Sequence, residues 1–184
     1  MNRALFLDRD GTLIVDVGYP RDPAEVALLP GAADTLRSLA NDWTLVIVSN
    51  QSGIARGLIT PEQANAVHDR VLAAFAAEGV AFAGVYYCPH APDAGCACRK
   101  PAPGLLLDAA RELDLDLAAS IMIGDKISDV AAGVAAGCGQ SIRFGPHTQA
   151  LEDDTHVMHC EDWPAVQRFV AEHCRSVAVA PDGT

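Results

Sequence analysis

Short apolar runs rich in β-forming residues alternate along this chain with longer stretches rich in Ala and Leu. The runs have the length of strands and cover residues 4–7, 44–48, 84–87, 121–123 and 141–144. Helical stretches occupy the sequence between most of them. This alternation is typical of a parallel sheet whose strands are joined by crossover helices, so the chain is predicted to be an α/β protein.

Helix signals support this reading. We expect helices over about 32–40, 61–78, 104–113, 128–137 and 162–174. Thr60 and Pro61 are residue types favoured at a helix N-cap and at the first helical position, and Ser128 is a candidate cap for the fourth helix. The predicted architecture is therefore a Rossmann-like parallel sheet with helices on both faces.

The length of 184 residues predicts one domain over 1–184, with a frayed tail over about 175–184. The segments between the first three strands are already filled by a loop or helix, so no separate lid domain fits there. We expect a capless fold whose active site is covered by loops, chiefly 15–25, 53–59 and 89–101.

Charge and apolar content exclude several classes of function. The net charge of −11 argues against binding of nucleic acid by bulk electrostatics. No apolar stretch reaches the roughly 18 to 20 residues of a membrane span, and the apolar segment before Asp8 is too short for a signal peptide. We expect a cytoplasmic protein without a membrane partner, and a monomer.

The strongest chemical signal follows the first predicted strand, where the chain reads Asp8-Arg9-Asp10-Gly11-Thr12. Side chains two positions apart in an extended chain point to the same side, so both carboxylates can approach one electrophile or one cation. Gly11 then allows a sharp turn. An ordinary turn would explain this segment if it stood alone.

Three further polar segments follow later parts of the sheet. A small hydroxyl at Ser49 comes after the second strand, two cations stand together at Arg99 and Lys100, and Asp125 follows the fourth strand with Asp129 four positions on. A turn, a solvated surface pair and a capping carboxylate would explain each of these separately. Ligands of such sheets bind at the carboxyl ends of the strands, which favours one shared site.

Taken in this order, the four segments resemble the motifs of the haloacid dehalogenase (HAD) superfamily of aspartate-nucleophile phosphohydrolases. The resemblance implies that Asp8 is the nucleophile and Asp10 the general acid and base. It implies that Ser49 and Lys100 hold the transferring phosphoryl group. It also implies a catalytic Mg²⁺ held by Asp8, the backbone carbonyl of Asp10 and Asp125, with Asp129 in a supporting role.

A compact cluster of metal-ligating residues occupies 88–98. Three thiols and one imidazole lie within eleven residues, at Cys88, His90, Cys96 and Cys98. This donor set matches a closed tetrahedral Zn²⁺ site with a structural role. A Cys96–Cys98 disulfide is sterically disfavoured at that spacing. The zinc would fix the loop that presents Arg99 and Lys100.

Within the superfamily, the runs 16–20, 49–57, 86–90 and 98–104 resemble the heptose 1,7-bisphosphate 7-phosphatase family. This resemblance implies a small phosphorylated sugar as substrate, loss of its 7-phosphate, and a place in the biosynthesis of nucleotide-activated heptose. The residues implied to line the substrate pocket are Asp16, Gly18, Tyr19, Asn50, Gln51, Ser52, Arg99 and Lys126.

Two alternatives stay open. The short spacing within the cysteine cluster equals that of the histidinol-phosphate phosphatase family, so an enzyme of histidine biosynthesis is the second candidate. A silent binding module or zinc-stabilised interaction domain is the third. The intact set of Asp8, Asp10, Lys100 and Asp125 argues against the third.

Overall fold

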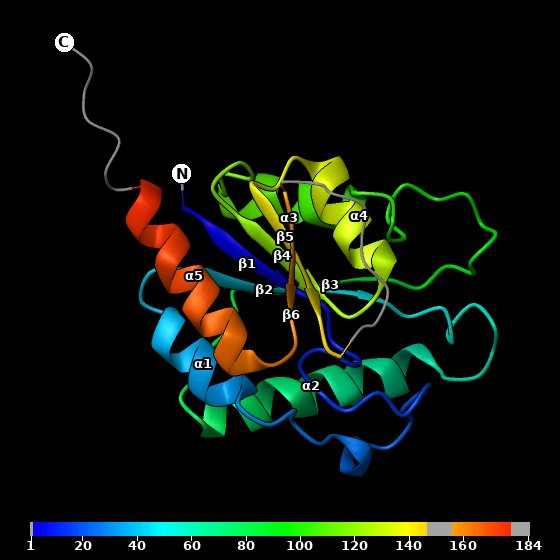
Figure 1. The fold of residues 1–184 in the computed structure, drawn as a ribbon. Helices are drawn as coiled ribbons and strands as arrows, with labels where there is room; N and C mark the ends of the chain where they lie inside the picture. Colours follow the sequence, from blue (N-terminus) through cyan, green and yellow to red (C-terminus); the bar gives the residue numbers. More distant parts are fainter. Residues whose placement is uncertain (1, 147–155, 178–184) are drawn as a thin grey trace.

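A parallel sheet of six strands forms the centre of the protein in the part that this computed structural model describes, residues 2–146 and 156–177 (Figure 1). The strands lie in the order β3-β2-β1-β4-β5-β6. Their bounds are β1 (Ala4–Leu7), β2 (Thr44–Asn50), β3 (Gly84–Cys88), β4 (Ile121–Gly124), β5 (Gln140–Phe144) and β6 (Val157–Cys160). The predicted α/β fold class is confirmed.

The sixth strand was not predicted from the sequence. β6 pairs with β5 and forms the edge of the sheet, and its Met158 and His159 are exposed. The short, half-polar sequence of β6 lacks the apolar run that marks the strands buried on both faces. Its strand character therefore comes from pairing with β5.

Helices cover both faces of this sheet (Figure 1). One short 3₁₀ helix and five α-helices are described: η1 (Pro23–Glu25), α1 (Ala32–Leu39), α2 (Pro61–Ala77), α3 (Gly104–Leu113), α4 (Ile127–Ala136) and α5 (Trp163–Val177). Side chains of α1, α2 and α5 pack in one core, and side chains of α3 and α4 pack in the other. None of the described helices is long and apolar enough to cross a membrane.

Strand β1 lies at the centre of both cores. Leu5 and Leu7 point into the core beneath α1, α2 and α5, whereas Ala4 and Phe6 point into the core beneath α3 and α4. All four are fully buried. Because both faces are covered, β1 is a continuous apolar run without polar alternation.

Two helix starts show how far local sequence signals reach. The Thr60 hydroxyl accepts a hydrogen bond from the Gln63 N–H at 3.2 Å, which confirms the predicted cap of α2. The cap predicted at Ser128 is wrong, because α4 begins at Ile127. The Asp129 carboxylate accepts a hydrogen bond from the Lys126 N–H at 2.9 Å, so the helix begins earlier in the chain than predicted. Helix α5 continues to Val177, and the tail from 178 lies outside the described residues.

The strand order brings the polar segments together. The chain runs outward from β1 through β2 to β3 and then returns to β4 on the other side of β1. In register, Leu7 pairs with both Ile47 and Ile123, so the three strands end at a common edge. A crevice at such a switch point is the usual ligand site of a parallel sheet.

Candidate active site

Asp8 is the first residue after β1 and is almost completely buried. The Lys100 ammonium lies 2.6 Å from Asp8 Oδ1 and 2.8 Å from Asp129 Oδ1, and it also donates to the Val48 carbonyl at 2.8 Å. Lys100 is itself buried. The site therefore holds one ammonium group between two carboxylates away from bulk water.

Asp8, Asp129 and Lys100 together carry more negative than positive charge when both carboxyl groups are ionised. Burial raises the pKa of Asp8 to about 7 despite the opposing effect of Lys100, and Asp129 and Asp10 push it in the same direction as burial. Burial lowers the pKa of Lys100, but Asp8 and Asp129 outweigh it, so the net shift is upward. Lys100 therefore stays charged, and the carboxylates would be stabilised by further positive charge.

A divalent cation fits between Asp8 and Asp125. One carboxylate oxygen from each of Asp8, Asp125 and Asp129 lies within 4.8 Å of the others. Asp125 Oδ1 is buried and has no hydrogen-bond partner among the described residues, whereas both oxygens of Asp129 already accept hydrogen bonds, from Lys100 and Lys126. Oxygen ligands of this kind suit Mg²⁺.

Gly11 makes room for this arrangement. It has a φ of 87°, and a Cβ at this position would lie 2.6 Å from Asp125 Oδ2. Any other residue would displace the Asp125 carboxylate.

The Asp10 carboxylate lies in a separate network. Arg9 donates to it from Nη2 at 2.9 Å and from Nε at 3.2 Å, and Gln51 Nε2 donates to Oδ2 at 2.9 Å. Gln51 Nε2 also lies 2.8 Å from the Ser49 hydroxyl. Arg9 was not predicted as a site residue, because strand alternation alone directs its side chain away from the two aspartates.

Asn50 connects β2 with the loop that carries Lys100. Its Nδ2 donates to the Lys100 carbonyl at 3.0 Å, and its Oδ1 accepts from the Lys100 N–H at 3.1 Å. Both ends of the amide are therefore engaged by backbone. Asn50 was predicted only as a substrate-binding residue, and the structure gives its side chain a positioning role.

A cavity of about 470 Å³ opens beside these networks. Asp10 and Lys100 line it, together with all eight residues predicted to bind substrate: Asp16, Gly18, Tyr19, Asn50, Gln51, Ser52, Arg99 and Lys126. A larger hollow lies near Arg3 and Trp43 at the opposite end of the sheet, where none of the motif residues lies.

Cations and two loops form the outer wall of this cavity. Lys126 Nζ lies 3.3 Å from Asp16 Oδ2, and Arg99 has a buried Nη1 without a hydrogen-bond partner in the described part of the chain. Arg56 Nη1 donates to the Tyr19 hydroxyl at 2.7 Å and so joins loop 15–25 to loop 53–59. The cavity wall thus presents positive charge in addition to that of Lys100.

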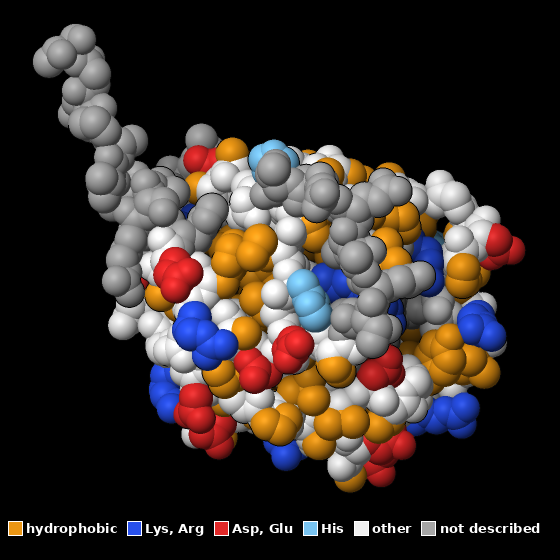
Figure 2. All heavy atoms as spheres, in the orientation of Figure 1, with side chains coloured by type: hydrophobic (Ala, Val, Ile, Leu, Met, Phe, Trp, Pro, Cys, Tyr) orange, Lys and Arg blue, Asp and Glu red, His pale blue; other side chains and the backbone are white. Residues whose placement is uncertain are grey.

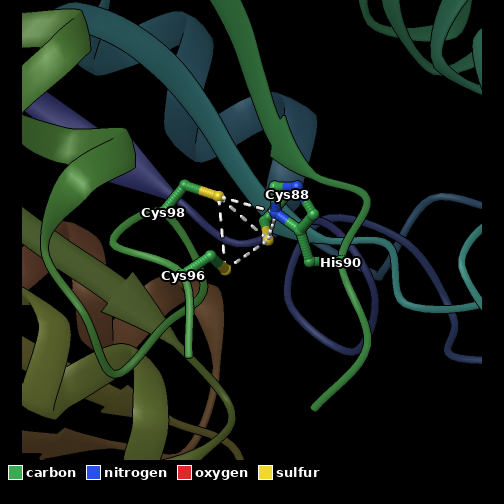
Figure 3. A group of neighbouring side chains, drawn as sticks. All are labelled: Cys88, His90, Cys96 and Cys98. Carbon is green, nitrogen blue, oxygen red and sulfur yellow. Dashed lines mark hydrogen bonds between the residues drawn. The ribbon is translucent and has the colours of Figure 1, made fainter. Parts of the chain in front are cut away.

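The predicted metal-ligating cluster is assembled in space (Figure 3). Cys98 Sγ lies 3.1 Å from Cys88 Sγ and 3.2 Å from His90 Nδ1, and Cys96 Sγ lies 3.6 Å from both other sulfurs. Donors around a tetrahedral Zn²⁺, with bonds of about 2.0–2.3 Å, are separated by roughly 3.3–3.8 Å. The donor set therefore fits zinc closely.

Position in the chain links this cluster to the cavity. Burial raises the pKa of the Cys88 thiol, and a bound cation would favour its thiolate form. Cys98 is followed directly by Arg99 and Lys100, and the Gly104 N–H donates to the Ala97 carbonyl at 3.0 Å. The loop is thus tied to α3 as well. No disulfide is formed among the described cysteines.

A parallel sheet with an Asp-x-Asp segment after its central strand, a buried Lys against the first Asp and a further Asp after the neighbouring strand defines a HAD-type hydrolase. Residues 97–142 match the family model described as HAD-hydrolase-like.

Curated relatives narrow this class. The D-glycero-β-D-manno-heptose-1,7-bisphosphate 7-phosphatase of Yersinia pestis is 45% identical over 147 residues, which cover 76% of this chain and 78% of the relative. The enzyme of the same name from Bordetella bronchiseptica is 43% identical over 172 residues, with coverage of 89% and 95%. This chain belongs to that family of phosphatases, and the resemblance noted from its motifs is confirmed.

Solved structures agree. The crystal structure of the D,D-heptose 1,7-bisphosphate phosphatase of B. bronchiseptica, complexed with magnesium and phosphate, has a TM-score of 0.83 at 36% identity and covers 94% of this chain and 99% of its own. A putative HAD-like phosphatase from Mesorhizobium loti has a TM-score of 0.81 at 35% identity, with coverage of 92% and 85%.

Proposed function

We propose that this protein removes the 7-phosphate of D-glycero-β-D-manno-heptose 1,7-bisphosphate. The observation that carries the proposal is the cavity that Asp10 and Lys100 line together with two further cations, Arg99 and Lys126. A bisphosphate needs two separate positive regions, one for each phosphate. The names of the relatives supply the sugar.

The proposed reaction has two steps. The Asp8 carboxylate attacks phosphorus in line and the bond to the sugar oxygen breaks, while Asp10 gives its proton to that oxygen. Water then attacks the aspartyl-phosphate, and the Asp10 carboxylate takes a proton from it. Lys100 and Ser49 hold the phosphoryl oxygens during both steps.

The other predicted site residues take supporting roles in this proposal. Arg99 and Lys126 bind the second phosphate, and loops 15–25 and 50–52 surround the sugar. Mg²⁺ bound by Asp8, Asp125 and the Asp10 carbonyl would neutralise charge between nucleophile and phosphate. Zn²⁺ bound by the four residues of the 88–98 loop would have a structural role.

We further propose that the enzyme acts as a monomer. On the face shown in Figure 2, acidic and basic side chains of described residues are interspersed, which suits a soluble substrate better than a polyanionic partner. The cytoplasmic location stays a prediction.

The test is phosphate release in the presence of Mg²⁺, comparing kcat/KM for the heptose bisphosphate with that for histidinol phosphate. We expect a preference of about a hundredfold or more for the heptose bisphosphate, since the cationic wall would be left unpaired by a monophosphate. A preference for histidinol phosphate would overturn the proposal. Asp8→Asn should abolish turnover with the fold intact, and Asp10→Asn should cost several orders of magnitude.

A further inference from the structure

Arg9 is a fully buried cation next to the catalytic carboxyl groups. It is only 1% exposed, although it stands directly between Asp8 and Asp10. Its carbonyl accepts hydrogen bonds from the N–H groups of Leu13 and Ile14 at 2.9 and 3.1 Å, which closes the turn after β1. The backbone of Arg9 is therefore fixed, and its side chain extends from a rigid base.

The guanidinium group of Arg9 is directed at Asp10. Nε and Nη2 each lie between 2.9 and 3.2 Å from both Asp10 oxygens. Asp10 is the acidic residue that pairs with Arg9 in the described part of the chain. A planar fork that faces a carboxylate in this way fixes its rotation as well as its position.

No second cation competes for the same carboxylate from α2. The neighbouring titratable group is His68, and burial lowers its pKa to about 3, with the charge of Arg9 acting in the same direction. His68 is therefore neutral at physiological pH. Among the described residues, the cation that pairs with Asp10 is Arg9.

Gln51, the first residue after β2, also holds the Asp10 carboxylate. Its amide donates to Asp10 Oδ2 at 2.9 Å and contacts the Ser49 hydroxyl at 2.8 Å, so one side chain links the acid to a phosphoryl-binding residue. Gln51 is 4% exposed, whereas the Asp10 side chain is 12% exposed and lines the cavity. Arg9 and Gln51 thus hold Asp10 from the protein side and leave its open side to the substrate.

We propose that Arg9 and Gln51 are positioning residues that orient the Asp10 carboxyl group for proton transfer to the leaving oxygen. The inference rests on the proposed function, because it needs Asp10 to act on a departing alcohol. Neither residue has to touch the substrate for this role. Loss of Arg9 would leave the Asp10 carboxyl group held by Gln51 alone and less restricted in its rotation.

The leaving group of the substrate separates this role from a purely structural one. Departure of a sugar alkoxide needs a proton from Asp10, whereas p-nitrophenolate leaves without one. The ratio kcat/KM covers steps only up to departure of the leaving group, so the later action of Asp10 on water does not enter. We therefore compare kcat/KM for heptose bisphosphate and for p-nitrophenyl phosphate in each variant.

In Arg9→Met we expect kcat/KM to fall by about 30-fold or more for the sugar and by less than about 3-fold for the aryl phosphate, as general acid catalysis contributes roughly 10²–10⁴. Arg9→Lys keeps the charge without the fork, and its sugar-specific loss should be smaller. The control is Arg111→Met, which removes an exposed Arg paired with Asp108 on α3 and should change neither value.

Equal losses for both substrates, or no loss, would overturn the inference. If neither Arg9 variant folds, as judged by circular dichroism, Gln51→Met decides in a comparison of phenyl phosphate with p-nitrophenyl phosphate, since Gln51 lines the cavity and neither of these substrates carries a sugar. Phenolate is the poorer leaving group and depends more on the proton from Asp10, so kcat/KM for phenyl phosphate should fall more. Failure of the wild-type enzyme to release phosphate from either substrate would instead overturn the proposed function. A wild-type enzyme active on both substrates separates the two outcomes.

Discussion

The Lys100 ammonium lies 2.6 Å from the Asp8 carboxylate, although the two residues are 92 positions apart in the chain. The same ammonium reaches Asp129 and the end of β2. Lys100 also stands two positions after Cys98, so the cysteine-rich loop and Asp8, the proposed nucleophile, are joined through one side chain. The stability of this region and its chemistry should therefore change together.

Lys100→Met leaves two buried carboxylates without their shared cation. We expect the free energy of unfolding at pH 8 to fall by about 3 kcal/mol, because a broken buried ion pair leaves uncompensated charge. We expect kcat/KM to fall by about 10²–10³ as a phosphoryl-holding group is lost. Urea unfolding and phosphate release measure the two effects.

The control for this variant is Arg37→Met, which removes a solvent-exposed partner of Asp34. It should cost less than about 1 kcal/mol, as exposed ion pairs do. Unchanged stability in Lys100→Met would contradict the buried pairing.

Asn50→Asp tests the contact between β2 and the backbone of Lys100. The carboxylate can still accept the Lys100 N–H, but it cannot donate to the Lys100 carbonyl and places charge beside it. We expect a stability loss of about 1–3 kcal/mol and a fall of about tenfold in kcat/KM, since Lys100 is held less firmly.

Asn65→Asp is the matched control, because Asn65 is exposed on α2 and its side-chain oxygen only accepts a hydrogen bond, from Tyr87. It should alter neither quantity appreciably. Equal effects of the two substitutions would argue against a special role for Asn50.

Cys96→Ser tests the metal centre. Elemental analysis of the purified wild-type protein should find about one zinc per chain, because four donors close a tetrahedral site. Cys96→Ser should lose most of this zinc and unfold at lower temperature. Its activity should also fall, since the loop that it destabilises continues into Arg99 and Lys100.

Cys138→Ala provides the comparison, because Cys138 lies outside the cluster and is buried near the end of α4. It should keep its zinc whatever it loses in stability. Zinc content that is the same in both variants would rule out the proposed ligand set.

His68 predicts a specific acid sensitivity. Burial lowers its pKa from 6.5 to about 3, so between these values the unfolded chain binds one proton more than the folded chain. The stability that the protein has with His68 neutral is fully present above pH 6.5, and it is lost as the pH falls toward 3, because protonation of His68 then favours the unfolded chain. The loss amounts to about 1.4 kcal/mol per pH unit in that window.

His68→Phe removes this titratable group and keeps an aromatic ring in contact with Tyr87. Urea unfolding at pH 7, 6 and 5 should show that the free energy of unfolding falls less steeply with pH in the variant than in the wild type. Below pH 6.5 the difference in slope should approach that of one bound proton. Because every other group titrates in both proteins, the difference between the curves isolates His68. Parallel curves would contradict the assignment.

Strand and helix periodicity predicted much of the fold. The apolar runs that became β1, β2, β4 and β5 are mostly buried and that of β3 is half-buried, and short-range patterning is enough to mark them. β6 escaped because its strand character depends on the neighbouring β5. The predicted start of α4 was wrong because the capping group is the side chain of Asp129 and not that of Ser128. Asp129 lies three positions after Lys126 and binds its N–H.

The sequence by itself determined which residues stand at the strand ends, because a strand and the residues that follow it are local features. It therefore placed Asp8, Asp10 and Asp125 at strand ends, and the spacing of residues 88–98 predicted that four possible metal donors lie in one loop. Only the tertiary structure decided which side chains meet. Periodicity specifies the face on which a side chain leaves the backbone, but its partner comes from another element. The pairing of Arg9 and Gln51 with Asp10, and of Asn50 with the Lys100 backbone, follows from how β1, β2 and the 88–101 loop pack together.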